Sequence, residues 1–311
     1  MSAWIILATL GQLLSAVVVV LDKYIVTEEK VLPRPFVYAF YSCLLTGFWV
    51  VVFFLGYIPS LSHWGVPTFA DVEKPTIQVV GMSVLAAYTL FMALVSLYDA
   101  LRRAPAADVM PIIGAVSALT TFCLSYFLLE IILPTNFIFG VAVLIIGTLL
   151  VAQVLPEKFT LLYTVHSGLF FGLHYITMKG LFEETNFADG FFWSRIGLVF
   201  FALSLLMVPT YYKKIVERTK EAGARAGLIV LLTKVLAGIA AFMLLKATDL
   251  GDVSVVQALD GLKFVFILII TLLFSSFLPK SVSMPEATPD RVRQQILYVA
   301  VITIGFLILF L

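Results

Sequence analysis

The sequence predicts an all-α integral membrane protein with ten transmembrane helices in two inverted five-helix repeats. Its 311 residues are 61% hydrophobic and only 13% charged, whereas soluble domains are about half apolar and a quarter charged. Ten apolar runs approach the ~20 residues that a helix needs to cross a bilayer. The two halves of the chain also align with each other, which indicates an internal duplication.

A search of the chain with a window as long as one membrane-spanning helix finds these runs. The first, AWIILATLGQLLSAVVVVL, lacks a basic leading segment and a small-residue cleavage site. We therefore expect it to be a helix of the fold and not a signal peptide. The predicted helices cover residues 3–21, 36–56, 77–98, 109–129, 137–155, 161–180, 190–210, 226–246, 253–277 and 295–311.

Turn-forming residues separate most of these runs. Proline and glycine interrupt helices, and polar residues beside them favour turns. In chain order the breaks read VLPRPF, SLSHWGVP, LRRAPAAD, LPTN, LPEK and, before the last helix, LPKSVSMPEATPDR.

Two pairs of segments align between the halves. SAVVVVLDKYIV aligns with FGLHYITMKGLF, which pairs Lys23 with Lys179. GVAVLIIGTLLVA aligns with YVAVITIGFLILF, which pairs Gly147 with Gly305. The two matches occur in the same order and at nearly the same offset, about half the chain length, so we interpret them as a duplication.

The duplication predicts two repeats, residues 1–156 and 157–311, that together form one transmembrane unit. Each repeat holds five predicted helices, an odd number, so the second repeat enters the membrane the opposite way up. Inverted repeats are typical of secondary transporters, whose substrate sites lie between the repeats near the bilayer midplane.

This pattern resembles the drug/metabolite transporter superfamily, specifically its EamA-type members with ten helices. The resemblance covers nearly the whole chain and is best in residues 117–151, where Glu130 matches the family's glutamate at the end of helix four. Lys23 and Lys179 match the basic residue that ends the first helix of each repeat, and Arg195, in FFWSRIGLVFF, matches an arginine near the start of a repeat's second helix. The resemblance implies a central cavity lined by helices one, three, four, six, eight and nine.

The chain departs from the family pattern at several places. The first repeat has Phe40 where the arginine would fall, and the second repeat has FSSFLPK in place of the glutamate at the helix end. The stretch LDGLKF in helix nine matches no motif of the family. The resemblance therefore implies no particular substrate.

Helix nine carries the most informative charges. Asp260 and Lys263 stand near the middle of VSVVQALDGLKFVFILIITLLFSSF, where each charge costs roughly 2.5–3.5 kcal/mol to insert. Their spacing of three puts them on one helical face, with Gln257 one turn earlier. We expect this face to line the interior, where the pair either binds a polar or zwitterionic substrate, exchanges a proton, or serves as a structural ion pair.

Helix six carries His166, Phe170, His174 and Thr177 along one stripe. His174 and His166 would couple transport to protons by titrating near neutral pH, or they only hydrogen-bond inside the bundle. A metal site needs a third ligand at suitable spacing, and the sequence offers none, so we expect neither a metal nor another cofactor. The glycines of GLFFG on the adjacent face are interpreted as packing residues.

Other polar residues complete the set of candidates. Lys234 in helix eight either faces the interior or snorkels to the interface, and Gln12 in helix one would form a polar wall. Four residues are assigned to gates or helix ends. They are Glu130, as a gate or a cap; Lys23, as an interfacial anchor; Lys179, at the end of its helix; and Arg195, reaching headgroups or backbone carbonyls.

The predicted function is secondary transport of a small polar, amphipathic or zwitterionic metabolite by alternating access, with proton coupling as an option. The alternatives are a lipid or lipid-headgroup flippase of the same fold and, less favoured, a membrane-embedded enzyme. Motifs of membrane proteases and hydrolases such as HExxH and GxSxG are absent, as is a P-loop. The net charge of +1 excludes a basic nucleic-acid binder.

The expected partners are therefore a small-molecule substrate and the bilayer of the inner or plasma membrane, and a monomer is compatible with the sequence.

The charge pattern and the family resemblance predict opposite orientations in the membrane. Loops after odd-numbered helices hold fourteen Lys and Arg residues against three after even-numbered helices, which predicts cytoplasmic odd loops and both termini outside. The family resemblance implies both termini in the cytoplasm.

Overall fold

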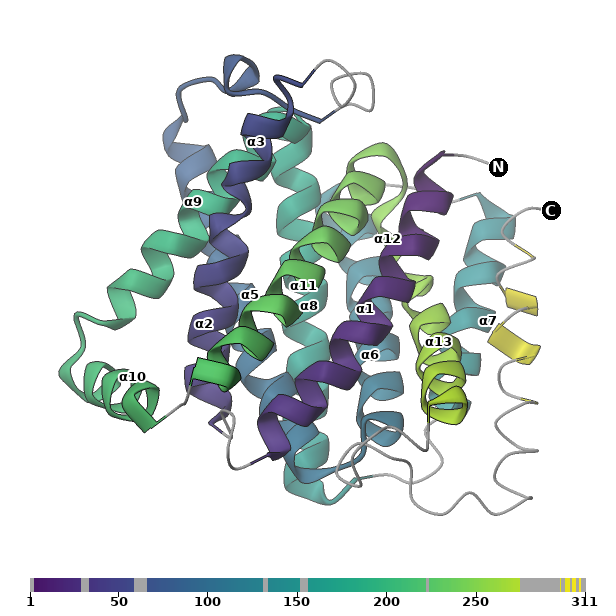
Figure 1. The fold of residues 1–311 in the computed structure, drawn as a ribbon. Coiled ribbons are helices and arrows are strands. Elements are labelled where there is room, and N and C mark those ends of the chain that lie inside the picture. Colours follow the sequence, from purple (N-terminus) through teal and green to yellow (C-terminus); the bar gives the residue numbers. More distant parts are fainter. Residues whose placement is uncertain are drawn as a thin grey trace.

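The computed structural model of the chain is a bundle of helices (Figure 1). It describes residues 3–28, 34–58, 66–130, 134–151, 156–221 and 224–274, together with seven residues between 297 and 308. Helices are the only regular secondary structure in these residues. The all-helical class predicted from the sequence is therefore confirmed for the described part of the chain.

The helices follow the predicted order. They are α1 (Ala3–Thr27), α2 (Pro35–Gly47), η1 (Phe48–Val51), α3 (Val52–Leu55), η2 (Phe69–Asp71), α5 (Ile77–Arg103), α6 (Ala106–Leu128), α7 (Thr135–Val151), α8 (Lys158–Glu184), α9 (Phe187–Leu205), α10 (Pro209–Glu221), α11 (Ala224–Leu250), α12 (Val253–Ala258) and α13 (Asp260–Leu273). The most extensive packing joins α5 to α8 and α1 to α11. In Figure 1, α11 rises from the lower left beside α1, which descends from the upper right.

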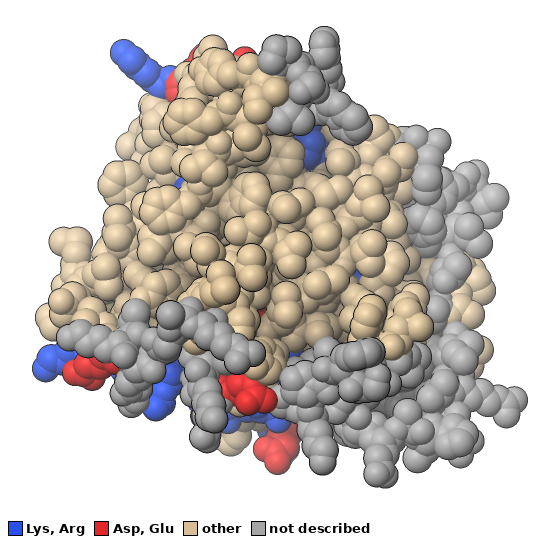
Figure 2. All heavy atoms as spheres, viewed as in Figure 1, with Lys and Arg blue, Asp and Glu red and all other residues tan. Residues whose placement is uncertain are grey.

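Seven helical segments of the described chain are long and apolar enough to cross a membrane. Helix α8 has a similar length but is more polar, and the apolar part of α7, Phe137–Leu150, is shorter. On the face in Figure 2, charged side chains gather towards the upper and lower ends, and the band between them is almost entirely uncharged. These features identify a multi-pass integral membrane protein.

Helix nine, predicted as one helix over 253–277, is a single apolar span over Val253–Thr271 with a one-residue break inside it. Helix α12 ends at Ala258 and α13 begins at Asp260, with Leu259 as a turn between them. The Leu262 N–H donates to the Leu259 carbonyl at 2.9 Å, a contact three residues apart that tightens the backbone locally. The break therefore falls beside the first intramembrane charge of the LDGLKF stretch.

Two further expectations need correction or lie outside the described residues. The sequence predicts helix seven to continue to residue 210, but α9 ends at Leu205 and the separate short helix α10 follows, at the lower left of Figure 1. Its run of Lys, Glu and Tyr residues is too polar to extend an apolar span. Most of the predicted tenth helix, 295–311, lies outside the described residues, although its described residues are helical.

Glycines set the closest helix contacts, as predicted for GLFFG. A Cβ on Gly168 would lie 2.9 Å from the Ile113 carbonyl oxygen, and one on Gly172 would lie 3.0 Å from the Ser117 carbonyl oxygen. Both glycines thus bring α8 against the backbone of α6. Close backbone approach through small residues four apart is a common way to pack membrane helices.

Candidate functional site

A cavity of about 170 Å³ with charged and apolar lining residues lies inside the bundle. It is lined by residues of α1, α2, α5, α6, α8, α9, α11, α12 and α13. These elements include all six helices expected to line it, and α2 and α9, the second helix of each predicted repeat, join them. The charged and polar lining residues are Ser15, Asp22, Ser42, Thr46, Tyr98, Ser117, His174, Tyr175, Arg195, Lys234, Gln257, Asp260 and Lys263.

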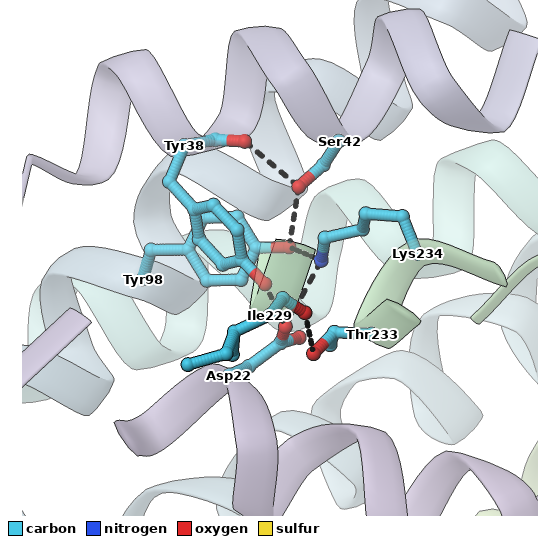
Figure 3. A network of polar contacts seen from close by, with 7 residues as sticks. All are labelled: Asp22, Tyr38, Ser42, Tyr98, Ile229, Thr233 and Lys234. Carbon is cyan, nitrogen blue, oxygen red and sulfur yellow. Dashed lines mark hydrogen bonds and ion pairs between the residues drawn. The ribbon is translucent and has the colours of Figure 1, made fainter. Parts of the chain in front are cut away.

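Lys234 forms the centre of a buried network (Figure 3). Its Nζ donates to Asp22 Oδ1 at 2.9 Å and to the Tyr98 hydroxyl at 2.9 Å. The same Nζ lies 4.2 Å from the centroid of the Tyr38 ring, a distance at which a cation is attracted to an aromatic face. Because the Lys234 side chain is only 3% exposed, this lysine does not snorkel to the interface.

The network extends from Asp22 and Tyr98 to helix α2. The Tyr38 hydroxyl donates to Asp22 Oδ1, and Ser42 Oγ lies 3.0 Å from the Tyr98 hydroxyl. Ser42 Oγ also donates to the Tyr38 carbonyl at 2.8 Å. A buried ion pair is stable only when further hydrogen bonds satisfy its remaining donors and acceptors, and these hydroxyl groups provide them.

A second ion pair lines the cavity at the break in helix nine. Lys263 Nζ lies 2.7 Å from Asp260 Oδ1, so the predicted pairing is present. Gln257, one turn earlier, accepts a hydrogen bond from Ser117 Oγ at 3.1 Å. Gly114 of α6 makes room for the acid, because a Cβ there would lie 3.1 Å from Asp260 Oδ2.

Arg195 differs from its predicted role. It was expected at a helix start, reaching headgroups or carbonyls, but α9 begins at Phe187 and the arginine lies two turns inside it. The residue is 1% exposed, lines the cavity, and its guanidinium carbon lies 4.8 Å from the centroid of the Phe191 ring. Its Nε and Nη2 atoms have no hydrogen-bond partner among the described residues.

The two histidines of α8 have different surroundings. His174 lines the cavity, and its Nδ1 donates to the Ala86 carbonyl at 2.9 Å. His166 is half-buried outside the cavity lining, with Nδ1 2.7 Å from Ser96 Oγ and its ring against Phe170. The structure thus separates two residues that the stripe on helix six had grouped.

Gln12 and Glu130 do not reach the cavity lining. Gln12 is fully buried, and neither amide atom has a partner among the described residues. Glu130 is exposed just beyond α6 and has a φ of 53°, the left-handed conformation that often follows a helix end. Neither residue therefore belongs to the cluster of groups described above.

Lys23 and Lys179 make equivalent contacts with helix ends. Lys23 Nζ donates to the carbonyls of Leu101 and Ala104, at the end of α5. Lys179 Nζ donates to the carbonyls of Asp249 and Gly251 at 3.3 Å each, at the end of α11. Each lysine thus satisfies carbonyl groups that a helix end leaves without intrahelical partners.

The carboxyl group of Asp252 lies near Lys179. Burial raises the pKa of the Asp252 carboxyl, whereas hydrogen bonds from the backbone of Val255 and Ser254 and the nearby Lys179 oppose that shift. Asp252 accepts from Ser254 N at 2.8 Å and caps α12. This acid therefore stabilises the start of α12.

Gly147 and Gly305, the other pair aligned in the sequence, contact each other's helices reciprocally. A Cβ on Gly147 would lie 3.1 Å from the Ile302 nitrogen. A Cβ on Gly305 would lie 2.9 Å from the Leu144 nitrogen. Leu144 and Ile302 occupy the same place in the aligned segments, three residues before each glycine.

The sequence interpretation missed Asp22 and its partners Tyr38, Ser42 and Tyr98. In helix one it selected the face that contains Gln12 and Lys23, whereas the cavity is lined by Ser15, Val18, Val19 and Asp22. These four residues also form a helical stripe, turned by one residue from the selected face. An acid inside the apolar run VVVVLDKYIV was the available signal.

The fold and the cavity define a multi-pass helical membrane protein with a charged interior site. Among the described residues, His, Cys, Asp and Glu side chains form no group of three that could hold a metal ion. No protein-family model and no curated protein matches the chain. Chains of solved structures do match, and one of them aligns with a TM-score of 0.63 at 14% identity over 98% of this chain and 96% of its own. At that identity the match shows a shared fold alone.

Proposed function

We propose that the protein is a secondary transporter of the EamA type in the drug/metabolite transporter superfamily. It moves a small polar, amphipathic or zwitterionic metabolite across the membrane by alternating access through the central cavity. In this proposal the chain consists of ten transmembrane helices in two inverted repeats, and it performs no covalent chemistry on its cargo.

The observation that carries the proposal is the charged cavity inside the bundle. Intramembrane charges usually mark substrate or ion pathways, and Asp260 and Lys263 line the cavity. The substrate sites of secondary transporters typically lie near the bilayer midplane, between the repeats.

The contacts of the aligned residues support the inverted repeats. Lys23 of α1 binds the end of α5, and Lys179 of α8 binds the end of α11. In Figure 1, α1 ends at the lower end of the bundle and α11 at the upper end, so the two equivalent contacts lie at opposite ends. The reciprocal contacts of Gly147 and Gly305 support the same duplication.

A reconstitution experiment tests the function. The purified protein is first screened by thermal shift against amino acids, amines, small carboxylates, nucleotide sugars and lipid headgroups. The stabilising compound is then radiolabelled, and its exchange into proteoliposomes preloaded with the unlabelled compound is measured. We expect exchange with the wild-type protein and none with the Asp260→Asn/Lys263→Met double variant, whose retained fold is checked by its melting temperature.

The alternatives give different results in the same vesicles. A flippase would move a fluorescent phospholipid between leaflets without exchanging any soluble compound. An enzyme would convert the stabilising compound into a product that mass spectrometry detects. Either result would contradict solute transport.

A further inference from the structure

We infer that Arg195 binds a carboxylate of the transported molecule, so that the cargo is a small organic monocarboxylate. The inference deepens the proposed transport function and rests on it for the word cargo. It starts from a buried cation in the cavity lining, two of whose donor atoms lack partners among the described residues.

Among the residues that the structure describes, the charges of the cavity lining leave one cation without an acid. Lys234 is paired with Asp22, and Lys263 is paired with Asp260. These four residues and Arg195 are the Asp, Glu, Lys and Arg residues of the lining. With His174 counted as neutral, the lining therefore carries one net positive charge, and Arg195 is the residue that carries it.

The surroundings of Arg195 do not compensate its desolvation. Removing a cation from water costs several kcal/mol unless a partner and hydrogen bonds replace the water. Arg195 is 1% exposed, Phe191 covers one face of its guanidinium, and Nε and Nη2 lack partners among the described residues. An anion bound in the cavity, which Arg195 lines, would neutralise the charge.

Geometry and charge together favour a carboxylate. The planar guanidinium presents its N–H donors as a fork that matches the two oxygens of a carboxylate or of a phosphate. A phosphate monoester carries about −1.5 to −2 charges at pH 7, whereas a carboxylate carries the single charge that the cavity lacks. A monocarboxylate is therefore the better electrostatic match.

The remaining lining indicates the rest of the molecule. Apolar side chains such as Leu90, Leu94 and Phe171 border the same cavity. Tyr175, Arg195 and Asp260 line the same cavity, so the arginine and the second ion pair belong to one compartment. A volume of about 170 Å³ suits a small aliphatic or aromatic acid.

Matched ligands test the inference. The full-length protein in detergent is titrated with acetate, hexanoate and benzoate, and with hexanamide, benzamide, benzylamine and inorganic phosphate, and binding is read from the melting temperature. We expect at least one carboxylate to stabilise the protein, and its amide, the amine and phosphate not to do so. Equal stabilisation by an amide or amine, by phosphate, or by none of the carboxylates would overturn the inference.

Variants connect the effect to Arg195. Arg195→Gln should weaken carboxylate binding at least about tenfold, as expected for the loss of hydrogen bonds to a charged group. Its melting temperature without ligand should not fall, because a buried unpaired charge has been removed. If Arg195→Gln does not fold, Arg195→Lys replaces it in the test. This variant keeps the charge without the planar fork, so it should also bind the carboxylate more weakly than the wild type. The exposed Arg103→Gln is the control and should bind like the wild type.

The outcome is separable from the fate of the transport proposal. Arg195-dependent carboxylate binding without exchange in proteoliposomes would support the inference and contradict transport. Exchange of a cargo without a carboxylate, unaffected by Arg195→Gln, would support transport and contradict the inference.

Discussion

Lys234 Nζ and Asp22 Oδ1 lie 2.9 Å apart, although 212 residues separate them in the chain. Their side chains are 3% and 5% exposed, so the pair joins α1 to α11 inside the bundle. Tyr38 and Tyr98 contribute hydroxyl groups and ring faces to the same pair. The first prediction follows from this arrangement.

Removing one member of the Asp22–Lys234 pair should harm stability more than removing both. Asp22→Asn or Lys234→Met alone strands a buried charge, at a cost of about 3–5 kcal/mol, whereas a double replacement is often close to neutral. Unfolding of the single and double variants in detergent gives the coupling energy by a double-mutant cycle. The control is the more exposed pair Asp99 and Arg103, 3.5 Å apart, for which about 0–1 kcal/mol is expected. Additive effects at Asp22 and Lys234 would contradict the coupling.

The Asp260–Lys263 pair allows stability and function to be separated. Asp260→Asn alone should destabilise the protein more than Asp260→Asn combined with Lys263→Met, for the same reason. We expect the double variant to keep its fold and to lose solute exchange in proteoliposomes. A double variant that folds and still exchanges solute would show that the pair is structural.

Gly172 should not tolerate even one added methyl group. A Cβ at this position would press against the α6 backbone, 3.0 Å from the Ser117 carbonyl oxygen, and overpacking of this kind costs about 1–3 kcal/mol. The matched control is Gly81→Ala in α5, where a Cβ would meet nothing within 4 Å. That change should be neutral or stabilise the helix, by up to about 1 kcal/mol. Melting temperatures of the two variants give the comparison, and equal effects would argue against close packing at Gly172.

Orientation can be measured from two exposed lysines at opposite ends of the bundle. Lys213 lies in α10 at the lower end in Figure 1, and Lys74 lies in the segment between α3 and α5, whose α3 end is at the upper end. The excess of Lys and Arg after odd-numbered helices predicts that Lys213 faces the cytoplasm.

Each lysine is replaced by cysteine in a Cys123→Ser background, where Cys43 is buried. A membrane-impermeant maleimide added to intact cells should then label the Lys74→Cys variant and not the Lys213→Cys variant. The reversed pattern would agree with the EamA resemblance and contradict the charge count.

The local sequence determines much of this architecture. Hydropathy locates the helices because a spanning segment must be apolar over its own length, and the spacing of three between Asp260 and Lys263 places both on one face. Lys23 with Lys179 and Gly147 with Gly305 align because each pair has the same local surroundings in its own segment.

Packing between distant helices settles the rest. Asp22 meets Lys234, and Arg195 is buried in the cavity without a partner among the described residues, because α1, α9 and α11 meet at particular rotations about their axes. A turn of about one residue separates the face of α1 with Gln12 from the face with Asp22, and helical periodicity does not choose between them.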